Sequence, residues 1–551
     1  MHKLTRIALT ALLLAGFQTS QAQSFLEKGK VSGNIQMNAQ SYIEDSIIGA
    51  EKINNKVRTN TFANIHYNNG GFAAGLRYEY YAQPLVDFEK IGYVGEGIPY
   101  YYFSYTNGQM EVVLGSFYEQ FGSGLTYRSY EERNLGYDNA TRGIKIKARP
   151  YKGITLTGIW GKQRNLFEYS GQVRGIDADF SLNEMCEKIG GSPFRIGFGG
   201  NFVSKYEADN DPEYRLPENV AAFSGRANIG YKQFSLNGEY AYKFNDPSVL
   251  NSMIYKPGNA LLLTASYAKK GLGIYLTGLR TDNFDFRNKR TALLNNHMIN
   301  YIPTLTKEHT YALSSMYAYS SQPLGQTGFQ TEIQYKIPKK TLLGGKYGTD
   351  FAANYSRIYG IKRDTLATVT ENGGGMEGTL GYDSPFFGTG ILYFEDFNVE
   401  IGHKFNKNWK LIMSYVYLNY NMEVMEGHGS PEVKSHIVIG DLTYKINPKN
   451  ALRMELQHLS TKQDDGNWAY AQLEYTIAPH WFVSVLDRWN YGNPVEEKQV
   501  HYYNISGSYV HNATKVTLGF GKQYEGILCV GGVCRQVPAS YGMSLQVVTS
   551  F

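Results

Sequence analysis

The C-terminal segment, residues 541–551, constrains the fold of this chain more than any other stretch. Its side chains fall on two alternating faces: one carries Tyr541, Met543, Leu545, Val547, Thr549 and Phe551, and the other carries Gly542, Ser544, Gln546, Val548 and Ser550. Because successive side chains of a strand point to opposite sides, the segment predicts a strand with one apolar and one mostly polar face. The apolar face is suited to lipid.

An alternating final strand that ends in an aromatic residue resembles the assembly signal of bacterial outer-membrane β-barrels. The resemblance implies the outer membrane as the location and its barrel-assembly machinery as a partner. At the other end, a basic head precedes an apolar run at 7–17, and small side chains follow at Ser20 and Ala22. We therefore expect residues 1–22 to be a signal peptide and residues 23–551 to form a single barrel domain.

The same alternation recurs along the chain, for example at 31–40, 72–81, 452–457 and 516–521. No run of about eighteen apolar residues follows the leader, so no membrane-spanning helix is predicted. The mean hydropathy of −0.38 fits strands whose alternate residues meet lipid, and the 46 tyrosines suit interfacial belts or a sugar-binding surface. The net charge of +5 is small and the basic residues form no run, so nucleic acid is not an expected partner.

Short connections rich in Asn, Gly or Pro alternate with long ones. Short ones, such as 68–71 and 447–449, suit tight hairpins. Long ones lie near 43–57, 82–97, 120–140, 207–217, 244–256, 283–325, 360–390 and 422–433. We predict an all-β, transmembrane antiparallel up-and-down β-barrel of about 24 strands (range 22–26), with short periplasmic turns and long extracellular loops. The stretch 311–319 fits either an extra strand pair or part of a loop.

Tryptophans and cysteines give this topology further tests. Trp409 and Trp481 follow short turns, where a periplasmic aromatic belt would lie. The alternative is that they are ordinary aromatic residues of the strands. Cys529 and Cys534 flank a predicted two-residue turn, so we expect a disulfide that staples an outward-projecting hairpin in an oxidising compartment. Cys186 falls in a predicted periplasmic turn and is expected to be a free thiol.

The segment 115–139 is the loop that is richest in glycine and ionisable groups. Its charged members include Glu119, Glu131, Glu132, Arg133 and Asp138. One interpretation is a loop that folds into the lumen and lines a constriction or ligand site. The other is a solvated surface loop with local ion pairs.

Several stretches resemble one known family. They are FYEQFGSGL, YEERNLGYDNA, LTGLRTDNFDFR and KYGTDFAANYSRI. They look like a recurrent outer-membrane barrel family of Bacteroidetes-type bacteria whose members carry only an unknown-function label. The resemblance covers the mature chain and implies an outer-membrane barrel. It brings no activity and no binding residue with it.

Motifs for catalysis are missing from the sequence. The eleven histidines show no pair at metal-ligand spacing, and there is neither a G-x-S-x-G elbow nor a glycine-rich phosphate loop. A catalytic triad built from distant strands would be invisible in sequence. The acidic stretch 207–213 could hold calcium, but Pro212 and the lack of the loop glycine favour a solvated loop. We expect no enzyme, no cofactor and no metal.

On the predicted register, charges of both signs face the lumen: Arg77, Glu79, Glu400, Lys404, Arg453, Glu455 and Glu474. A lumen wall with charges of both signs is typical of a channel for neutral polar solutes, or of an interior closed by ion pairs. The first strand begins too soon after the leader for a plug domain, which argues against a TonB-dependent transporter. We expect a passive, porin-like channel for a small polar solute, constricted by 120–140 and 283–325, in contact with the lipid bilayer and lipopolysaccharide. The alternative is a surface scaffold, an adhesin or a component of an export or assembly complex without transport activity.

Overall fold

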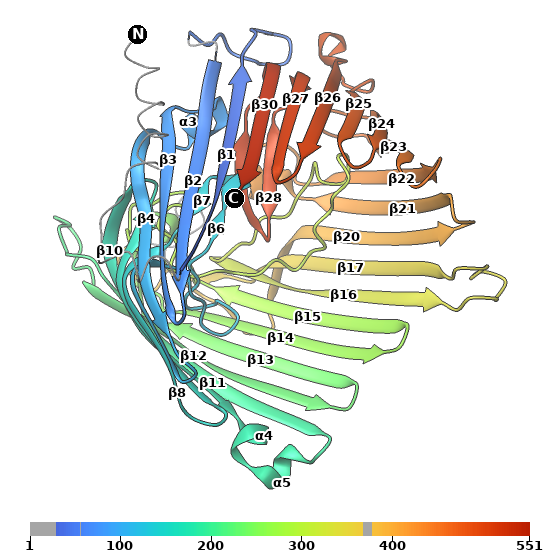
Figure 1. Cartoon of the computed structure of the whole chain (residues 1–551). Helices are drawn as coiled ribbons and strands as arrows, with labels where there is room; N and C mark the ends of the chain where they lie inside the picture. Colours follow the sequence, from blue (N-terminus) through green and yellow to red (C-terminus); the bar gives the residue numbers. More distant parts are fainter. Residues whose placement is uncertain (1–28, 55–56, 367–376) are drawn as a thin grey trace, which may run out of the picture.

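The protein is a closed β-barrel. The computed structural model describes residues 29–54, 57–366 and 377–551, so the predicted signal peptide lies outside the described residues. Twenty-four strands form one antiparallel sheet, which closes because β1 (Lys30–Ser41) pairs with both β2 (Val57–Asn69) and β30 (Ser540–Ser550) (Figure 1). The predicted fold and the predicted count of 24 strands are confirmed.

The other barrel strands follow in chain order. They are β3 (Phe72–Gln83), β4 (Gly95–Thr106), β5 (Met110–Phe117), β8 (Thr141–Tyr151), β9 (Ile154–Asn165), β10 (Glu168–Ser181), β11 (Phe194–Tyr206), β12 (Asn219–Tyr231), β13 (Phe234–Lys243), β14 (Gly258–Lys269), β15 (Leu272–Asp282), β16 (Gly325–Ile337), β17 (Thr349–Ile361), β20 (Thr389–Lys404), β21 (Trp409–Tyr420), β22 (Val433–Lys445), β23 (Asn450–Thr461), β24 (Trp468–Ile477), β25 (Trp481–Trp489), β26 (His501–His511) and β27 (Thr514–Gln523).

The connections carry shorter elements. Three small hairpins are formed by β6 (Glu131–Glu132) with β7 (Tyr137–Asp138), β18 (Asp364–Thr365) with β19 (Tyr382–Asp383), and β28 (Gly526–Val530) with β29 (Val533–Val537). The short helices are α3 (Val86–Lys90), η1 (Arg133–Leu135), α4 (Leu182–Met185), α5 (Glu187–Gly190), η2 (Val249–Asn251), α6 (Met422–Glu426) and η3 (Glu496–Lys498). No helix among the described residues is long and apolar enough to cross a membrane.

Side chains alternate along the wall between an apolar outer face and a more polar inner face. On β9, Trp160 is 58% exposed whereas its neighbour Ile159 is 5% exposed. On β12, the outward Phe223 is 43% exposed and the inward Arg226 is buried in an ion pair with Asp177. This pattern is the one that a barrel with lipid outside and polar groups inside requires.

Aromatic pairs encircle the end of the barrel that carries the short turns, here called the turn end. Trp409 stacks on Tyr444 with ring centroids 4.2 Å apart, and Trp481 packs on Tyr509 at 4.6 Å. Both tryptophans are exposed at the first position of their strands, as predicted. Similar pairs elsewhere on this end are Phe72–Tyr105, Phe194–Tyr231 and Phe234–Tyr267.

All eight predicted long connections emerge at the opposite end, here called the loop end. The stretch 311–319 forms no strand and belongs to the connection between β15 and β16, which resolves the alternative left open by the sequence. Cys186 lies between α4 and α5 at the turn end and is a free thiol, as expected. Cys529 and Cys534 form the predicted disulfide, with their Cα atoms 4.1 Å apart.

Candidate functional site in the lumen

The connection 118–140 folds into the barrel and packs against its inner wall. Phe121 and Tyr127 are fully buried in a cluster with Val173 of β10 and Val203 of β11. The Ser123 amide donates to the Glu239 carboxylate of β13 at 2.7 Å. The loop therefore enters the lumen, as one of the two interpretations of the sequence expected; that it lines a constriction or ligand site stays a prediction.

The connection 283–324 also runs inside the lumen, along the opposite part of the wall. It is held there by three bonds along the chain: His309 to Asp396 of β20 at 2.9 Å, the Leu313 amide to Gln457 of β23 at 2.9 Å, and Tyr317 to Asp464 of the β23–β24 connection at 2.9 Å. Leu313 and Tyr317 are buried against inward-facing side chains of the wall. Desolvation by burial raises the pKa of Asp464, which lies in the connection after β23.

The two connections bind each other in the middle of the barrel. The Arg128 amide donates to the Ile299 carbonyl at 2.9 Å, and the Tyr301 amide donates to the Gly124 carbonyl at 3.0 Å. The Arg128 guanidinium also lies over the Tyr301 ring, 4.0 Å from its centroid. A single layer of packed loops therefore crosses the lumen.

The β28–β29 hairpin joins this layer, which corrects the prediction that it projects outward. Its turn, Gly531–Gly532, has φ values of +57° and +82°, a left-handed conformation that glycine adopts without strain. Tyr301 donates its hydroxyl proton to the Gly531 carbonyl at 2.6 Å, and the Ser321 amide donates to the Gly532 carbonyl at 3.0 Å. The turn faces inward because its carbonyls find donors on the 283–324 connection. We call the connections 118–140 and 283–324 and the hairpin 526–537 the loop plug.

A buried ion-pair cluster fixes the loop plug to β3 and β9. Arg164 lies 2.6 Å from both Glu79 and Asp138, and Arg77 lies 3.0 Å from Asp138 and 2.9 Å from Glu131. The side chains of Arg164 and Glu79 are fully buried. Two guanidinium groups thus bind three carboxylates, and both loop carboxylates are held against the wall.

The other candidates from the sequence are distributed over the lumen. Glu119 pairs with Lys145, Arg133 pairs with Glu131, and Glu132 accepts the Asn134 amide at the start of η1. Towards the turn end, Arg453 binds Glu474 at 2.8 Å, Asp441 at 2.9 Å and also Glu455. Glu400 lies 4.0 Å from Lys307, and Lys404 lies over the Tyr347 ring. Their contribution to a constriction stays a prediction.

The acidic stretch 207–213 is arranged as local turns. Asp211 accepts the amides of Glu213 and Tyr214 at 2.9 Å, and Asp209 accepts the amide of Leu216 at 3.1 Å. Within the described part of the chain, no group of three or more His, Cys, Asp or Glu side chains could hold a metal ion.

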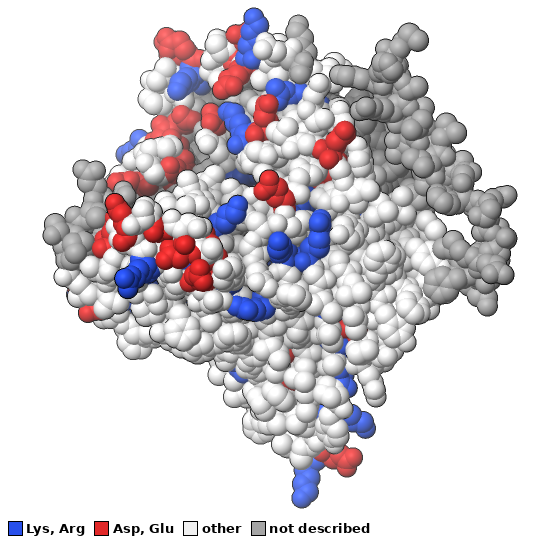
Figure 2. Space-filling view, turned by 90° about the vertical axis from the view of Figure 1, so that its left-hand side faces the viewer, with Lys and Arg blue, Asp and Glu red and all other residues white. Residues whose placement is uncertain are grey.

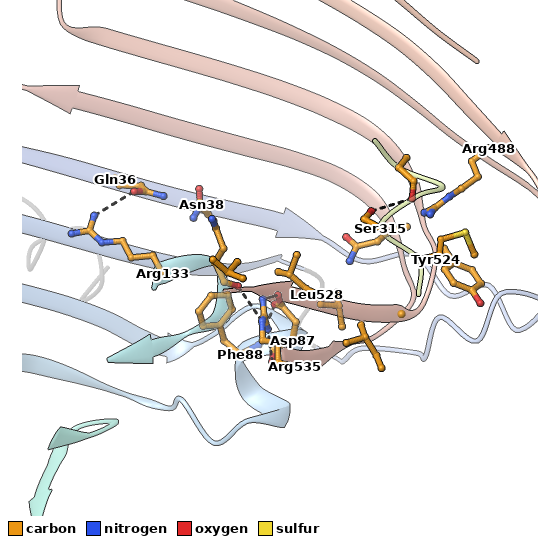
Figure 3. A pocket seen from close by; sticks show the side chains of 18 of the residues that line it. Gln36, Asn38, Asp87, Phe88, Arg133, Ser315, Arg488, Tyr524, Leu528 and Arg535 are labelled. Carbon is orange, nitrogen blue, oxygen red and sulfur yellow. Dashed lines mark hydrogen bonds and ion pairs between the residues drawn. The ribbon is translucent and has the colours of Figure 1, made fainter. Parts of the chain in front are cut away.

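Beside the loop plug lies a cavity of about 550 Å³, bounded by the hairpin, by the segment 312–316 and by the wall at β1, β25 and β27 (Figure 3). Gln36 and Asn38 of β1 line one side, and Ile527 and Leu528 of the hairpin line another.

Three arginines line this cavity, and two of them are paired. Arg133 binds Glu131, and Arg535 binds Asp87 at 2.8 Å. Arg488 of β25 lies among the rings of Trp468, Tyr502 and Tyr524. Among the described residues, no carboxylate lies within ion-pair distance of Arg488. The cavity therefore carries one uncompensated positive charge, that of Arg488. Figure 3 shows the Arg488 side chain extending from the wall towards the segment of Ser315.

Sequence reasoning missed several of these residues. Arg488 could have been predicted to face the lumen, because it shares the inner face of β25 with Ser484 and Leu486 at a spacing of two residues. Arg164 could not, since it directly follows the inward Gln163 and strand alternation assigns it to the outer face. Asp441 of β22 is the cross-strand partner of Glu455 of β23. The register that placed Glu455 in the lumen therefore also predicts that Asp441 faces the lumen.

Comparison with known proteins gives the family but no activity. A family of unknown function, DUF6029, matches residues 1–551. The chain belongs to this family. No curated protein matches it.

Among solved structures, the chain is similar to a mutant of the ferric enterobactin receptor PfeA from Pseudomonas aeruginosa, with 9% identity, a TM-score of 0.42, and coverage of 95% of this chain and 80% of that chain. It is also similar to the P pilus usher (PapC) translocation pore, with 8% identity, a TM-score of 0.36, and coverage of 95% and 99%. A mutant of the Rh. blastica porin is similar with 12% identity, a TM-score of 0.25, and coverage of 65% of this chain and 100% of that chain.

Proposed function

We propose that this member of the family is an outer-membrane channel of narrow bore that passes small polar solutes beside its loop plug. The observation that carries this proposal is the cavity between the plug and the wall at β1, β25 and β27, with its lining of amide, guanidinium and aliphatic groups. The outer-membrane location rests on the apolar outer face and the aromatic belt. The Bacteroidetes-type origin implied by the resemblance stays a prediction.

A passage in this position would be polar and crowded. Solutes would pass Gln36, Asn38 and Gln523 on the wall and the apolar hairpin residues on the other side. Below the plug, Arg453 and Glu474 are each about one-third exposed inside the barrel, so the turn-end half offers charges of both signs to water. Such a lining favours solutes that replace water with hydrogen bonds of either polarity. We propose no enzymatic activity and no cofactor.

A second candidate function is a sealed barrel that acts as a surface scaffold or as part of an export or assembly complex. The observation that favours it is the interlocking of the plug, in which the two long connections bind the wall, each other and the hairpin. In this case the cavity would be a closed chamber, and function would reside in the loop surface.

Single-channel conductance of the refolded barrel in a planar bilayer separates the two candidates. The test variant replaces residues 526–537 by a Gly-Gly link, which is feasible because Gly526 and Val537 are register partners. The control variant lacks 341–343, an exposed stretch at the turn end that lies outside the plug. A channel predicts small steps in the wild type and the control and steps several-fold larger in the hairpin variant. Silence of the wild type with opening of the hairpin variant would instead support the sealed barrel.

Ion selectivity tests the role of Arg488. If solutes pass this guanidinium, Arg488→Gln should lower the anion-to-cation permeability ratio several-fold, because a fixed charge in a narrow pore selects ions of opposite sign. The reversal potential in a salt gradient measures this ratio. A matched control is Lys336→Gln, which removes an equal charge from an exposed ion pair at the turn end.

A further inference from the structure

The outer face of β8, β9 and β10 changes from apolar to basic near the loop end. Along β9 the outward side chains are Ile154, Leu156 and Trp160, and the next outward residue is Lys162. On β8, Arg142 precedes the outward Ile144, and on β10, Arg174 precedes the outward Ile176. Trp160, Ile146 and Ile176 are 58%, 42% and 55% exposed, which marks this face as the lipid-facing one. Figure 2 shows basic side chains, with acidic ones among and above them, over a broad uncharged surface.

The three cations are close neighbours in the sheet. Lys162 is the direct cross-strand partner of Arg142, and Arg174 is the partner of Trp160, which precedes Lys162 by two residues on β9. Like charges directly opposite each other on one face of a sheet are destabilising. Their placement therefore calls for an anion between them.

The protein itself supplies no such anion. Arg142 donates to the Pro99 carbonyl at 2.8 Å and stacks on Tyr169, and Arg174 donates to the Asn219 side chain. In the part of the chain that the structure describes, none of the three cations forms an ion pair, and the Lys162 ammonium makes no hydrogen bond to the protein.

A hollow of about 710 Å³ lies on this face. Arg142, Trp160, Lys162, Gln172 and Tyr206 line it, with Lys289 at its rim. The carboxylate that lines it, Glu207, is engaged by Arg290, whose amide it accepts at 3.1 Å and whose guanidinium lies 3.8 Å away. The hollow is thus positive, and Trp160 adds an apolar ring to its lining.

A bulge shapes the edge of this hollow. The register between β9 and β10 shifts at Gly171, which has a φ of +64°. A bulge of this kind re-aims neighbouring side chains and ends regular pairing next to a site. Here it lies next to Gln172, which faces Lys162 across the strands.

We propose that Arg142, Lys162 and Arg174 form a binding site for the phosphate groups of a phosphorylated outer-leaflet lipid. The acyl chains lie along the apolar surface of Trp160, Ile144 and Ile176, and the phosphate lies between the guanidinium and ammonium groups. The position at the boundary between the apolar and basic surfaces favours a lipid over a free anion, since only a lipid uses both surfaces. The site is independent of solute passage through the lumen.

Native mass spectrometry of the delipidated, full-length barrel tests this site. The probes are a bis-phosphorylated lipid A, the same lipid without its phosphates, and inorganic phosphate as competitor. The triple variant R142Q/K162Q/R174Q should bind the phosphorylated lipid roughly 100-fold more weakly, as each cation near an anionic lipid contributes about fivefold. The control R149Q/K152Q/K188Q removes the same charge from the turn end and should bind like the wild type.

The outcomes are decisive in both directions. The proposal stands if affinity falls in the triple variant only and if the dephosphorylated lipid binds weakly to every variant. Equal affinity of the triple variant and the control overturns it, and full displacement by millimolar inorganic phosphate reduces the site to one for free anions. If the triple variant does not fold, K162Q alone replaces it, because Lys162 makes no contact that folding needs, and it should lower the affinity about fivefold.

Discussion

At the scale of single residues, the lumen is held by a few buried charges whose partners come from distant strands and loops. Strand alternation predicted that Arg77 and Glu79 face inward, and they do. Alternation carries no information on what a side chain meets across the barrel, so the contacts of Arg77 with Glu131 and Asp138 could not be predicted. Sequence therefore identified the inner face and missed the network.

Loss of Arg164 should be the most disruptive single change in this network. Arg164→Ala leaves Glu79 fully buried without its closest guanidinium, and breaking a buried pair in this way costs about 3–5 kcal/mol. Denaturant unfolding of the refolded protein in detergent measures the loss. The comparison is Lys336→Ala, which breaks the ion pair with Asp350. The two side chains of that pair are 54% and 67% exposed, so its loss should cost less than about 1 kcal/mol. Similar losses for both variants would contradict a structural role of the cluster.

Acid should loosen the loop plug through His297. Burial, together with the nearby Lys289 and Arg287, lowers the pKa of His297 from 6.5 to about 4. The docked loop keeps this imidazole neutral while an undocked loop would protonate it, so docking is fully favourable above about 6.5 and weakens as the pH falls towards about 4.

Hydrogen exchange of the 283–324 connection at pH 7 and pH 5 measures this effect, after correction for the intrinsic pH dependence of exchange. His297→Gln removes the titrating group and should reduce the acid-induced loss of protection. The raised pKa of Asp464 acts in the opposite direction in both proteins, so the difference between them isolates His297. An unchanged acid response in the variant would exclude this role.

At the scale of elements, the spacing of turn residues separated short turns from long connections with the correct topology. It could not give the direction in which a connection folds. The hairpin around Cys529 and Cys534 was predicted correctly as a stapled unit and wrongly as an outward projection. The deciding contacts are with Tyr301 and Ser321, more than two hundred residues away, and no local pattern encodes them.

The disulfide should matter for the hairpin and little for the barrel. Closing a loop of this size restricts the free hairpin by about 2 kcal/mol in the chain-entropy treatment, whereas the wall has its own complete ladder of hydrogen bonds. In a C529S/C534S variant, we expect faster hydrogen exchange at 526–537 and an unfolding midpoint near that of wild type. A C186S variant controls for the loss of a thiol at the other end. A large drop in global stability would show that the hairpin supports the wall itself.

At the scale of the whole molecule, barrel closure depends on the two terminal strands. Phe551 exchanges backbone hydrogen bonds with Gly33 at 2.9 and 3.0 Å, so the last residue completes the seam between β1 and β30. This much followed from sequence, because the alternation of 541–551 is regular and a barrel has to pair its ends. The location of the proposed solute path could not be predicted from the sequence, because it depends on how the loops pack.

Removal of Phe551 should impair assembly more than the stability of the finished barrel. The ring is 59% exposed, so its deletion removes little packing, but it shortens the seam and takes away the terminal aromatic. We expect a several-fold lower yield of folded protein, measured by heat-modifiable mobility on gels. Phe387→Ala, at a site that is 93% exposed in a loop, is the control and should fold normally. Equal yields would remove Phe551 from the assembly signal.

The positions of the loop-plug segments along the chain also set an order of events during folding. Its parts come from the first quarter, the middle and the C-terminal part of the chain, and the contact between Arg535 and Asp87 joins groups 448 positions apart. Contacts of such long range form late, because the intervening chain has to be in place first. A nascent barrel therefore passes through a stage with most strands paired and the hairpin still undocked. For that interval the cell envelope holds a wider opening than the mature protein ever presents.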